Sequence, residues 1–268
     1  MLNRAVKYAI TLAASSLPVG ASAMDNPVHL TVLEGWRQAD GTHVAAIKLD
    51  LDEGWKTYWR APGEGGVPPF FDFVGSENLV DFDVTWPAPV VFDQSGLWSI
   101  GYNDSVILPI EFEPNSNDAD IQLAGVLEIG VCKEVCLPIS LEVDATLPAD
   151  TTKKSPAIRA AMASVPYTKS EAAVESAVCK LSMNEAGMQI RATVEMPSAG
   201  ANEFVVIESS DPNHWFSETQ TMRDGSKLTS ESSLVAMDGG HLSIRRSDIR
   251  ITVLGDDYAV DIKGCTGS

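Results

Sequence analysis

The residues best suited to chemistry are four cysteines, two of which lie close together. Cys132 and Cys136 are separated by three residues, and the segments on either side alternate between apolar and polar residues, as β-strands do. On a straight strand their sulfurs would lie about 13 Å apart. A turn at residues 133–135 would instead place the two cysteines opposite each other, with Cα atoms about 4.5–5.5 Å apart, which allows a disulfide.

The flanking strands predict that both cysteines point to the polar side of this hairpin. Within each strand the apolar residues lie at every second position and so share one face, whereas the cysteine lies on the other face. The apolar residues are Leu127, Ile129, Val131, Leu137, Ile139, Leu141 and Val143. Closing so short a loop removes little entropy from the unfolded chain, so a disulfide there stabilises less than a long-range one. This favours a redox role over a structural one, which is the alternative. The spacing differs from the C-x-x-C of thioredoxin-like proteins.

The other two cysteines predict a different kind of bond. A disulfide between Cys179 and Cys265 would close a loop of about 85 residues and stabilise the fold by roughly 4 kcal/mol in the chain-entropy model. We interpret it as a structural disulfide. A second redox pair is the alternative.

The elements around these cysteines are mostly strands. Alternation recurs over residues 45–51, 139–143, 190–194 and 249–253, with turn residues between such segments. This pattern predicts an all-β protein made of antiparallel sandwiches.

One helix interrupts the strands, at about residues 155–164, where Ser155 can cap it and Pro156 can take its first position. A linker-like stretch precedes it, at residues 148–154. We therefore predict two β-sandwich domains, 24–150 and 151–268, joined by a short helical linker.

The first 23 residues have the features of a secretory signal peptide. Two basic residues precede a short apolar stretch that ends in Ala21-Ser22-Ala23, which predicts cleavage after Ala23 and export to the periplasm. The apolar stretch is shorter than the ~20 residues that span a bilayer, so we expect no membrane insertion. The formal charge of −18, from 37 acidic and 19 basic residues, argues against nucleic-acid binding.

A longer pattern of motifs supports a specific resemblance. Its pieces, in order, are residues 54–63 (GWKTYWRAPG), 66–69 (GVPP), 86–89 (WPAP), 101–102 (GY), 106–109 (VILP) and the cysteine hairpin that ends in Cys136-Leu137-Pro138. Their order and spacing resemble the N-terminal periplasmic domain of DsbD-family disulfide reductases, and the ScsB-like branch more closely. The resemblance is clear over residues 26–148 and weaker beyond them.

The resemblance implies an immunoglobulin-like fold and a cysteine pair that relays electrons to periplasmic thioredoxin-fold proteins, either disulfide isomerases or cytochrome-maturation proteins. By position and flanking sequence, Cys132 and Cys136 match the redox pair, and the family favours Cys136 as the attacking thiolate. The family also implies an aromatic cap over the disulfide, for which Tyr58, Trp59 and Tyr102 are the candidates. We expect no cofactor.

The sequence departs from the family pattern in three ways. Its cysteine spacing is shorter than in the best-known DsbD proteins, and it contains neither a membrane core nor a C-x-x-C thioredoxin domain. We therefore expect a component of a protein-disulfide reductase system that depends on a separate membrane electron donor.

Two other functions compete with this interpretation. Thiolates suit Cu(I), and the ScsB-like branch is associated with copper tolerance. However, the four histidines are scattered without the spacing of metal ligands: His29, His43, His214 and His241. The second alternative is a non-enzymatic binding module with two inert disulfides. Hydrolase and nucleotide-binding motifs are absent from the sequence.

Overall fold

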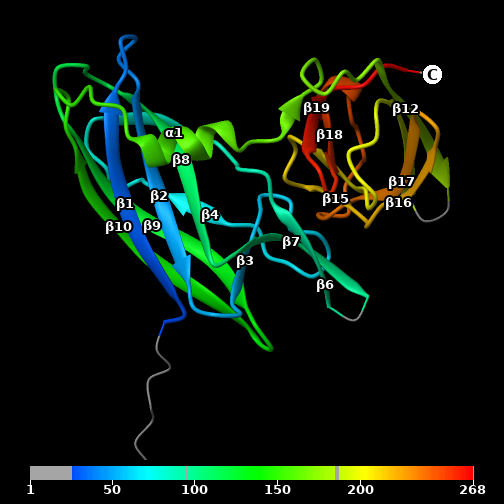
Figure 1. Cartoon of the computed structure of the whole chain (residues 1–268), viewed down its shortest axis with the longest axis horizontal. Helices are drawn as coiled ribbons and strands as arrows, with labels where there is room; N and C mark the ends of the chain where they lie inside the picture. Colours follow the sequence, from blue (N-terminus) through cyan, green and yellow to red (C-terminus); the bar gives the residue numbers. More distant parts are fainter. Residues whose placement is uncertain (1–25, 95, 185–186, 268) are drawn as a thin grey trace, which may run out of the picture.

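The computed structural model describes residues 26–94, 96–184 and 187–267, so the predicted signal peptide lies outside the described residues. The described chain forms four β-sheets, two from strands β1–β10 and two from strands β11–β19. We call these groups the N-terminal and C-terminal sandwiches. Figure 1 shows them next to each other, with the β6–β7 hairpin reaching toward the second group. The predicted domain limits near residue 150 stay a prediction.

The N-terminal sandwich holds the cysteine hairpin. Its first sheet has the order β1-β2-β8-β5, formed by Val28–Arg37, His43–Leu51, Ser105–Pro114 and Leu79–Val84. Its second sheet has the order β10-β9-β3-β7-β6, formed by Cys136–Leu147, Ile121–Cys132, Lys56–Tyr58, Leu97–Asn103 and Val90–Gln94; β4 (Phe70–Asp72) also pairs with β9. Strand β9 lies inside this sheet, which places Cys132 between β10 and β3.

Apolar side chains from both sheets meet in one core. The inward positions of β2 (Ala45, Ile47 and Leu49) face those of β9, such as Leu127 and Ile129, and all five are buried. Alternation along the strands produces this arrangement, because every second side chain points to the same face. The all-β prediction is confirmed, and strands occur where residues 45–51, 139–143, 190–194 and 249–253 alternate.

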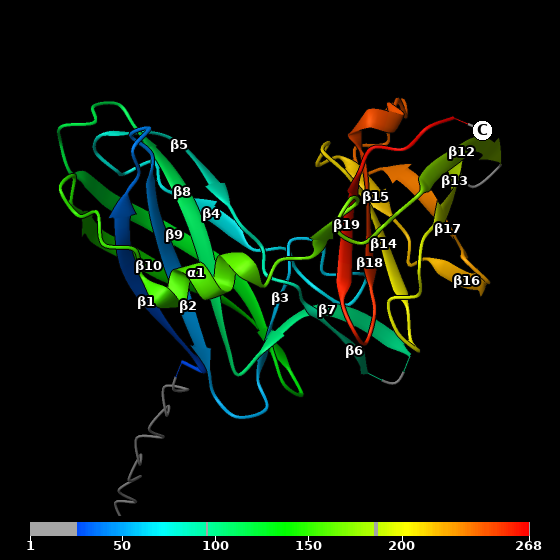
Figure 2. The same cartoon turned by 45° about the horizontal axis from the view of Figure 1, so that its top comes forward.

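Helix α1 (Pro156–Ala163) lies against the outer face of the first sheet (Figure 2). Its buried Ile158 packs on Trp36, Val44 and Ala46. Both faces of β2 are thereby covered, which explains why apolar residues occupy both sets of alternating positions, with Ala45 on the inner face and Ala46 on the face under the helix. Pro156 begins the helix as predicted, and Ser155 is the N-cap residue, but the Ser155 side chain makes no capping hydrogen bond.

The C-terminal sandwich has its own core. One sheet has the order β11-β19-β18-β14, formed by Tyr167–Thr168, Ala259–Lys263, Ile249–Leu254 and Phe204–Ser209. The other has the order β12-β13-β17-β15, formed by Ser176–Asn184, Gly187–Glu195, Lys227–Ala236 and His214–Phe216; β16 (Gln220–Asp224) also pairs with β17, and a 3-10 turn, η1, spans Arg246–Asp248. The short strand β11 runs parallel to β19, unlike the antiparallel pairing expected throughout.

The two sandwiches also touch each other. Val206, Leu254 and Ala259 of the C-terminal sandwich extend the N-terminal core, and the rings of Trp98 and Phe204 lie 5.8 Å apart. No helix among the described residues has the length and apolar character needed to cross a membrane.

Candidate redox site

Cys132 and Cys136 form a disulfide across the β9–β10 hairpin. The strand register pairs them directly, residues 133–135 make the turn, and their Cα atoms lie 4.1 Å apart. The predicted hairpin and the predicted opposition of the two cysteines are therefore present in the structure. The turn brings them together because β9 and β10 pair along their whole length, from Cys132 and Cys136 to Ile121 and Leu147.

The two cysteines differ sharply in exposure. Cys132 is fully buried, whereas Cys136 is exposed. Both cysteines lie on the face of the hairpin away from the apolar core, as predicted, because directly opposed residues share a face and Cys132 is not part of that core. The burial of Cys132 was not predicted. Cys132 is covered because β3 pairs with β9 on the side opposite β10, with Lys56 next to Cys132 in register. This long-range pairing leaves one sulfur accessible at the edge of the hairpin and the other enclosed.

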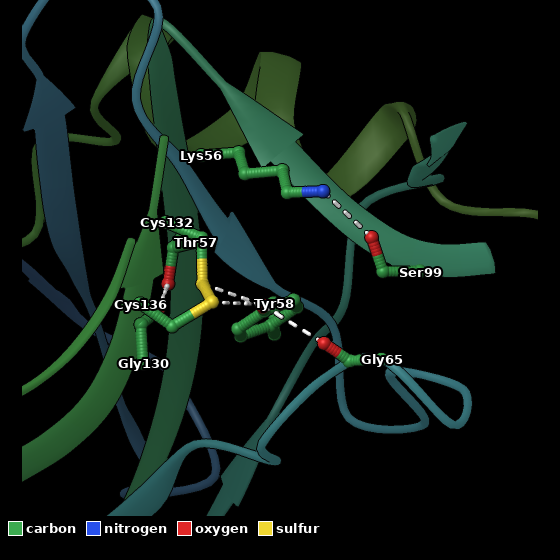
Figure 3. The surroundings of a disulfide bond; sticks show 8 residues. All are labelled: Lys56, Thr57, Tyr58, Gly65, Ser99, Gly130, Cys132 and Cys136. Atoms are coloured by element: carbon green, nitrogen blue, oxygen red, sulfur yellow. Dashed lines mark hydrogen bonds between the residues drawn. A yellow bond between two sulfur atoms is a disulfide. The ribbon is translucent and has the colours of Figure 1, made fainter. Parts of the chain in front are cut away.

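Tyr58, the last residue of β3, contacts both sulfurs. Its hydroxyl oxygen lies 2.6 Å from Sγ of Cys132, 3.5 Å from Sγ of Cys136 and 3.1 Å from the carbonyl oxygen of Gly65 (Figure 3). The sulfurs of a disulfide carry no proton and a carbonyl oxygen only accepts, so the hydroxyl is the donor in whichever of these hydrogen bonds forms. Tyr58 therefore supplies the one aromatic hydroxyl, among the three predicted cap residues, that reaches the sulfurs of Cys132 and Cys136.

Burial keeps the Tyr58 hydroxyl protonated. The side chain is almost fully enclosed, and desolvation raises the pKa of the Tyr58 phenol above its ordinary value. A phenol of this kind stays a hydrogen-bond donor at neutral pH. It can stabilise a thiolate on Cys132, because hydrogen bonds to charged acceptors are stronger than those to neutral ones.

Two glycines make room for the Tyr58 ring. A Cβ atom on Gly66 would lie 2.7 Å from Cδ1 of Tyr58, and one on Gly130 would lie 2.9 Å from Cε2. Both distances are too short for real side-chain contacts, so the ring occupies a slot that only glycine leaves open. Thr57 fixes the same region from the neighbouring position, because its hydroxyl donates to the carbonyl oxygen of Gly130 over 2.9 Å.

The other two predicted cap residues lie elsewhere. Trp59 is fully buried in the N-terminal core, with the Arg60 guanidinium 3.7 Å above its ring centroid. Tyr102 is also buried, and its hydroxyl donates to the carbonyl oxygen of Pro87 over 2.8 Å. Burial raises the pKa of the Tyr102 phenol as well. Strand alternation explains the separation, because neighbouring residues point to opposite sides.

Lys56 is a neighbour of the site that the sequence did not reveal. Although it pairs with Cys132 in register, its ammonium donates to Ser99 over 2.8 Å and lies over the ring of Phe92, away from the sulfurs (Figure 3). Burial lowers the pKa of the Lys56 ammonium. Gly65 and Gly66 were also missed as site residues. The only sequence signal for them is the glycine-rich stretch 63–66 directly after the aromatic motif.

The second predicted disulfide is present in the C-terminal sandwich. Cys179 and Cys265 are bonded, with Cα atoms 5.7 Å apart and a sequence separation of 86. Cys179 is fully buried in the C-terminal core. The bond ties β12 to the segment after β19, where the backbone N–H of Cys179 also donates to the carbonyl of Thr266.

Within the described ranges, no three residues of the types His, Cys, Asp and Glu gather as metal ligands would. The ring nitrogens of two histidines bond to other groups instead. His43 contacts the carbonyl of Glu34, and His214 contacts the hydroxyl of Ser209.

Comparisons with known proteins agree with this geometry. Residues 31–148 match the family described as "Thiol:disulfide interchange protein DsbD, N-terminal". The fold resembles the crystal structure of the N-terminal periplasmic domain of ScsB from Proteus mirabilis, with a TM-score of 0.68 and 22% identity over 92% of this chain and 96% of that one. No curated protein sequence matches the chain. The segment that matches the DsbD N-terminal family, residues 31–148, contains both Cys132 and Cys136.

Proposed function

We propose that the protein is a periplasmic thiol–disulfide exchange protein in which Cys132 and Cys136 alternate between a dithiol and a disulfide. The observation that carries the proposal is the asymmetry of the pair. Cys136 is exposed, whereas Cys132 is buried with its sulfur against the Tyr58 hydroxyl. An exchange site needs an accessible sulfur to meet the partner and a second sulfur nearby to complete the reaction.

In the forward reaction the Cys136 thiolate attacks one sulfur of a partner disulfide. A mixed disulfide forms, and the other partner sulfur leaves as a thiolate and takes up a proton. The Cys132 thiolate then attacks Sγ of Cys136, which releases the second partner thiolate. The partner gains two electrons and two protons, and Cys132 and Cys136 become a disulfide. The exposure of Cys136 supports its role as the attacking residue.

Tyr58 acts at the buried sulfur. When a donor thiolate reduces the oxidised protein by attacking Sγ of Cys136, the electron pair of the breaking bond goes to Sγ of Cys132. The hydroxyl of Tyr58 lies 2.6 Å from that atom and donates to the developing thiolate. The same contact poises the Cys132 thiolate for its attack on the mixed disulfide.

The partners follow from the family rather than from the geometry. The proposed acceptors are periplasmic thioredoxin-fold proteins, of the disulfide-isomerase or cytochrome-maturation type. The proposed donor is a separate membrane protein. Export would depend on the predicted signal peptide cut after Ala23.

The reduction potential of the Cys132–Cys136 pair tests the proposal. The protein would be equilibrated in glutathione or dithiothreitol buffers, its thiols trapped by alkylation, and the trapped peptides quantified by mass spectrometry. A potential between roughly −120 and −270 mV, as in exchange proteins, supports the relay. If the reduction potential of the pair instead lies below about −300 mV, the bond is a structural disulfide. The binding-module alternative would then replace the proposal. The Cys179–Cys265 bond serves as an internal reference in the same samples.

A further inference from the structure

Residues 60–66, which we call the cap loop, control where Tyr58 lies. The carbonyl oxygen of Gly65 accepts a hydrogen bond from the Tyr58 hydroxyl, and Gly66 forms one wall of the slot around its ring. A displacement of the cap loop would therefore move the hydroxyl away from Sγ of Cys132. The stability of this loop is part of the redox site.

Backbone contacts hold only part of the cap loop. The N–H of Gly65 donates to the carbonyl of Trp98 over 3.3 Å, and the carbonyl of Pro62 accepts from the N–H of Ile100 over 2.9 Å. The loop contains three glycines, and Gly63 adopts a positive φ of 77°. Because glycine gives the unfolded or displaced loop many conformations, such a segment needs side-chain contacts to stay in one place.

The C-terminal sandwich supplies those contacts through Arg60. Nε of Arg60 donates to Oε1 of Glu208 over 2.8 Å, and Nη2 donates to the hydroxyl of Thr252 over 3.3 Å. The side chains of Arg60 and Glu208 are only 13% and 18% exposed. The stacking of the guanidinium on Trp59 fixes its other face. A charge-assisted hydrogen bond shielded from water in this way is stronger than a surface ion pair.

A second contact reaches the middle of the cap loop. The carboxylate of Glu64 accepts a hydrogen bond from the backbone N–H of Glu218 over 3.1 Å. A cleft of about 1070 Å³ lies where the loop and the C-terminal sandwich meet, and its lining includes Arg60, Glu64, Glu208 and Glu218. The loop is thus held at two points, residues 60 and 64, by a unit that is distant in sequence.

We infer that the C-terminal sandwich braces the cap loop, and that Arg60 is a positioning residue that keeps Tyr58 against Cys132. This inference rests on the proposed redox function of the cysteine pair. It also gives the C-terminal sandwich a role beyond that of a spacer: it determines how well the buried sulfur is shielded.

Differential alkylation of the reduced protein tests the brace. In the reduced wild type, iodoacetamide should modify exposed Cys136 rapidly and buried Cys132 slowly. Glu208→Gln keeps the side-chain shape but removes the nearer of the two carboxylates beside Arg60, since Glu208 lies at 2.8 Å and Asp261 at 4.0 Å. Arg250 keeps Asp261 as its partner at 2.6 Å. We expect the alkylation rate of Cys132 to rise by roughly fivefold or more, because the shielded hydrogen bond between residues 60 and 208 loses its negative acceptor and is weakened. The rate at Cys136 should change little.

Glu64→Ala provides an independent variant. Glu64 is exposed, so its removal leaves the cores intact, and it should also speed the alkylation of Cys132. The matched control is Glu231→Gln, which breaks the exposed ion pair with Arg191 on the same sandwich, away from the cap loop, and should leave the rate unchanged.

Wild-type rates at Cys132 in both Glu208→Gln and Glu64→Ala would overturn the brace. If Glu208→Gln unfolds the C-terminal sandwich, seen as exposure of its buried disulfide at Cys179, Glu64→Ala alone decides. The alkylation rate measures the accessibility of Cys132, whereas the reduction potential tests the exchange function. The brace can therefore fail while the potential still supports exchange, and the exchange function can fail while the alkylation rates still support the brace.

Discussion

The phenolic oxygen of Tyr58 lies between two competing acceptors, 2.6 Å from Sγ of Cys132 and 3.1 Å from the carbonyl oxygen of Gly65. The hydroxyl has one proton and can direct it to only one of them. A disulfide sulfur is a weak acceptor, so the Gly65 carbonyl is favoured in the oxidised protein. A Cys132 thiolate is a charged and stronger acceptor. The hydroxyl proton is therefore expected to turn from Gly65 toward Cys132 when the pair is reduced, while Gly66 of the cap loop still encloses the Tyr58 ring.

Removal of the Tyr58 hydroxyl should impair reduction of the pair. In Tyr58→Phe the ring stays in its slot, but the thiolate that leaves from Cys132 has lost its donor. We expect dithiothreitol to reduce the bond roughly tenfold more slowly, and the reduction potential to fall by about 30 mV, which corresponds to a tenfold change in equilibrium. Thiol trapping over time measures the rate, and redox buffers measure the potential.

The matched control for this variant is Tyr102→Phe, which removes a buried hydroxyl bonded to Pro87, away from the sulfurs. It should leave both quantities unchanged. Because burial raises the pKa of Tyr58 above the ordinary value of about 10, its hydroxyl stays protonated below that pH. The difference between wild type and Tyr58→Phe should therefore persist from pH 6 to 9, and a difference that vanishes in this range would contradict the donor role.

A methyl group in the tyrosine slot should reproduce the loss of the hydroxyl. In Gly66→Ala the new Cβ would lie 2.7 Å from the Tyr58 ring and 2.5 Å from Cβ of Pro62, so the ring or the loop must move. We expect slower reduction of the pair, in the direction seen for Tyr58→Phe. The double variant should be no slower than Tyr58→Phe alone, because both changes act on one contact.

Gly267→Ala is the control for this substitution, because a Cβ there meets its nearest neighbour at an ordinary 3.6 Å. Additive rate effects in the double variant would mean that Gly66 acts on the sulfurs by a route other than Tyr58.

Single cysteine variants should reveal the order of attack. Cys132→Ser retains the exposed thiol and should form a mixed disulfide with oxidised glutathione readily. Cys136→Ser retains only the buried thiol, and we expect it to react at least about tenfold more slowly, because access limits exchange as strongly as nucleophilicity does. Intact-mass spectrometry follows the adduct of 305 Da, roughly the mass of one glutathionyl group. Faster reaction of Cys136→Ser would reverse the assigned roles.

Local patterns in the sequence were sufficient to predict the strands and the cysteine hairpin. Out-of-phase cysteines on both sides of a three-residue turn fix the pairing of Cys132 with Cys136, because only neighbouring residues are involved. Local patterns could not predict that Cys132 is buried, because Tyr58, which covers it, belongs to β3, more than 70 positions earlier in the sequence. Selecting Tyr58 over Trp59 required the same long-range pairing. The bond between Arg60 and Glu208 joins residues 148 positions apart.

The bond between Cys179 and Cys265 should stabilise the fold without taking part in exchange. Replacing both residues by serine should lower the free energy of unfolding by roughly 4 kcal/mol, because the closed loop is long, whereas the same change at Cys132 and Cys136 should cost roughly 2 kcal/mol. Urea unfolding measures both. The potential of the Cys132–Cys136 pair should be unaffected by Cys179→Ser with Cys265→Ser, provided that the C-terminal sandwich stays folded. A protein that loses exchange while retaining its fold would mean that the second bond belongs to the electron pathway.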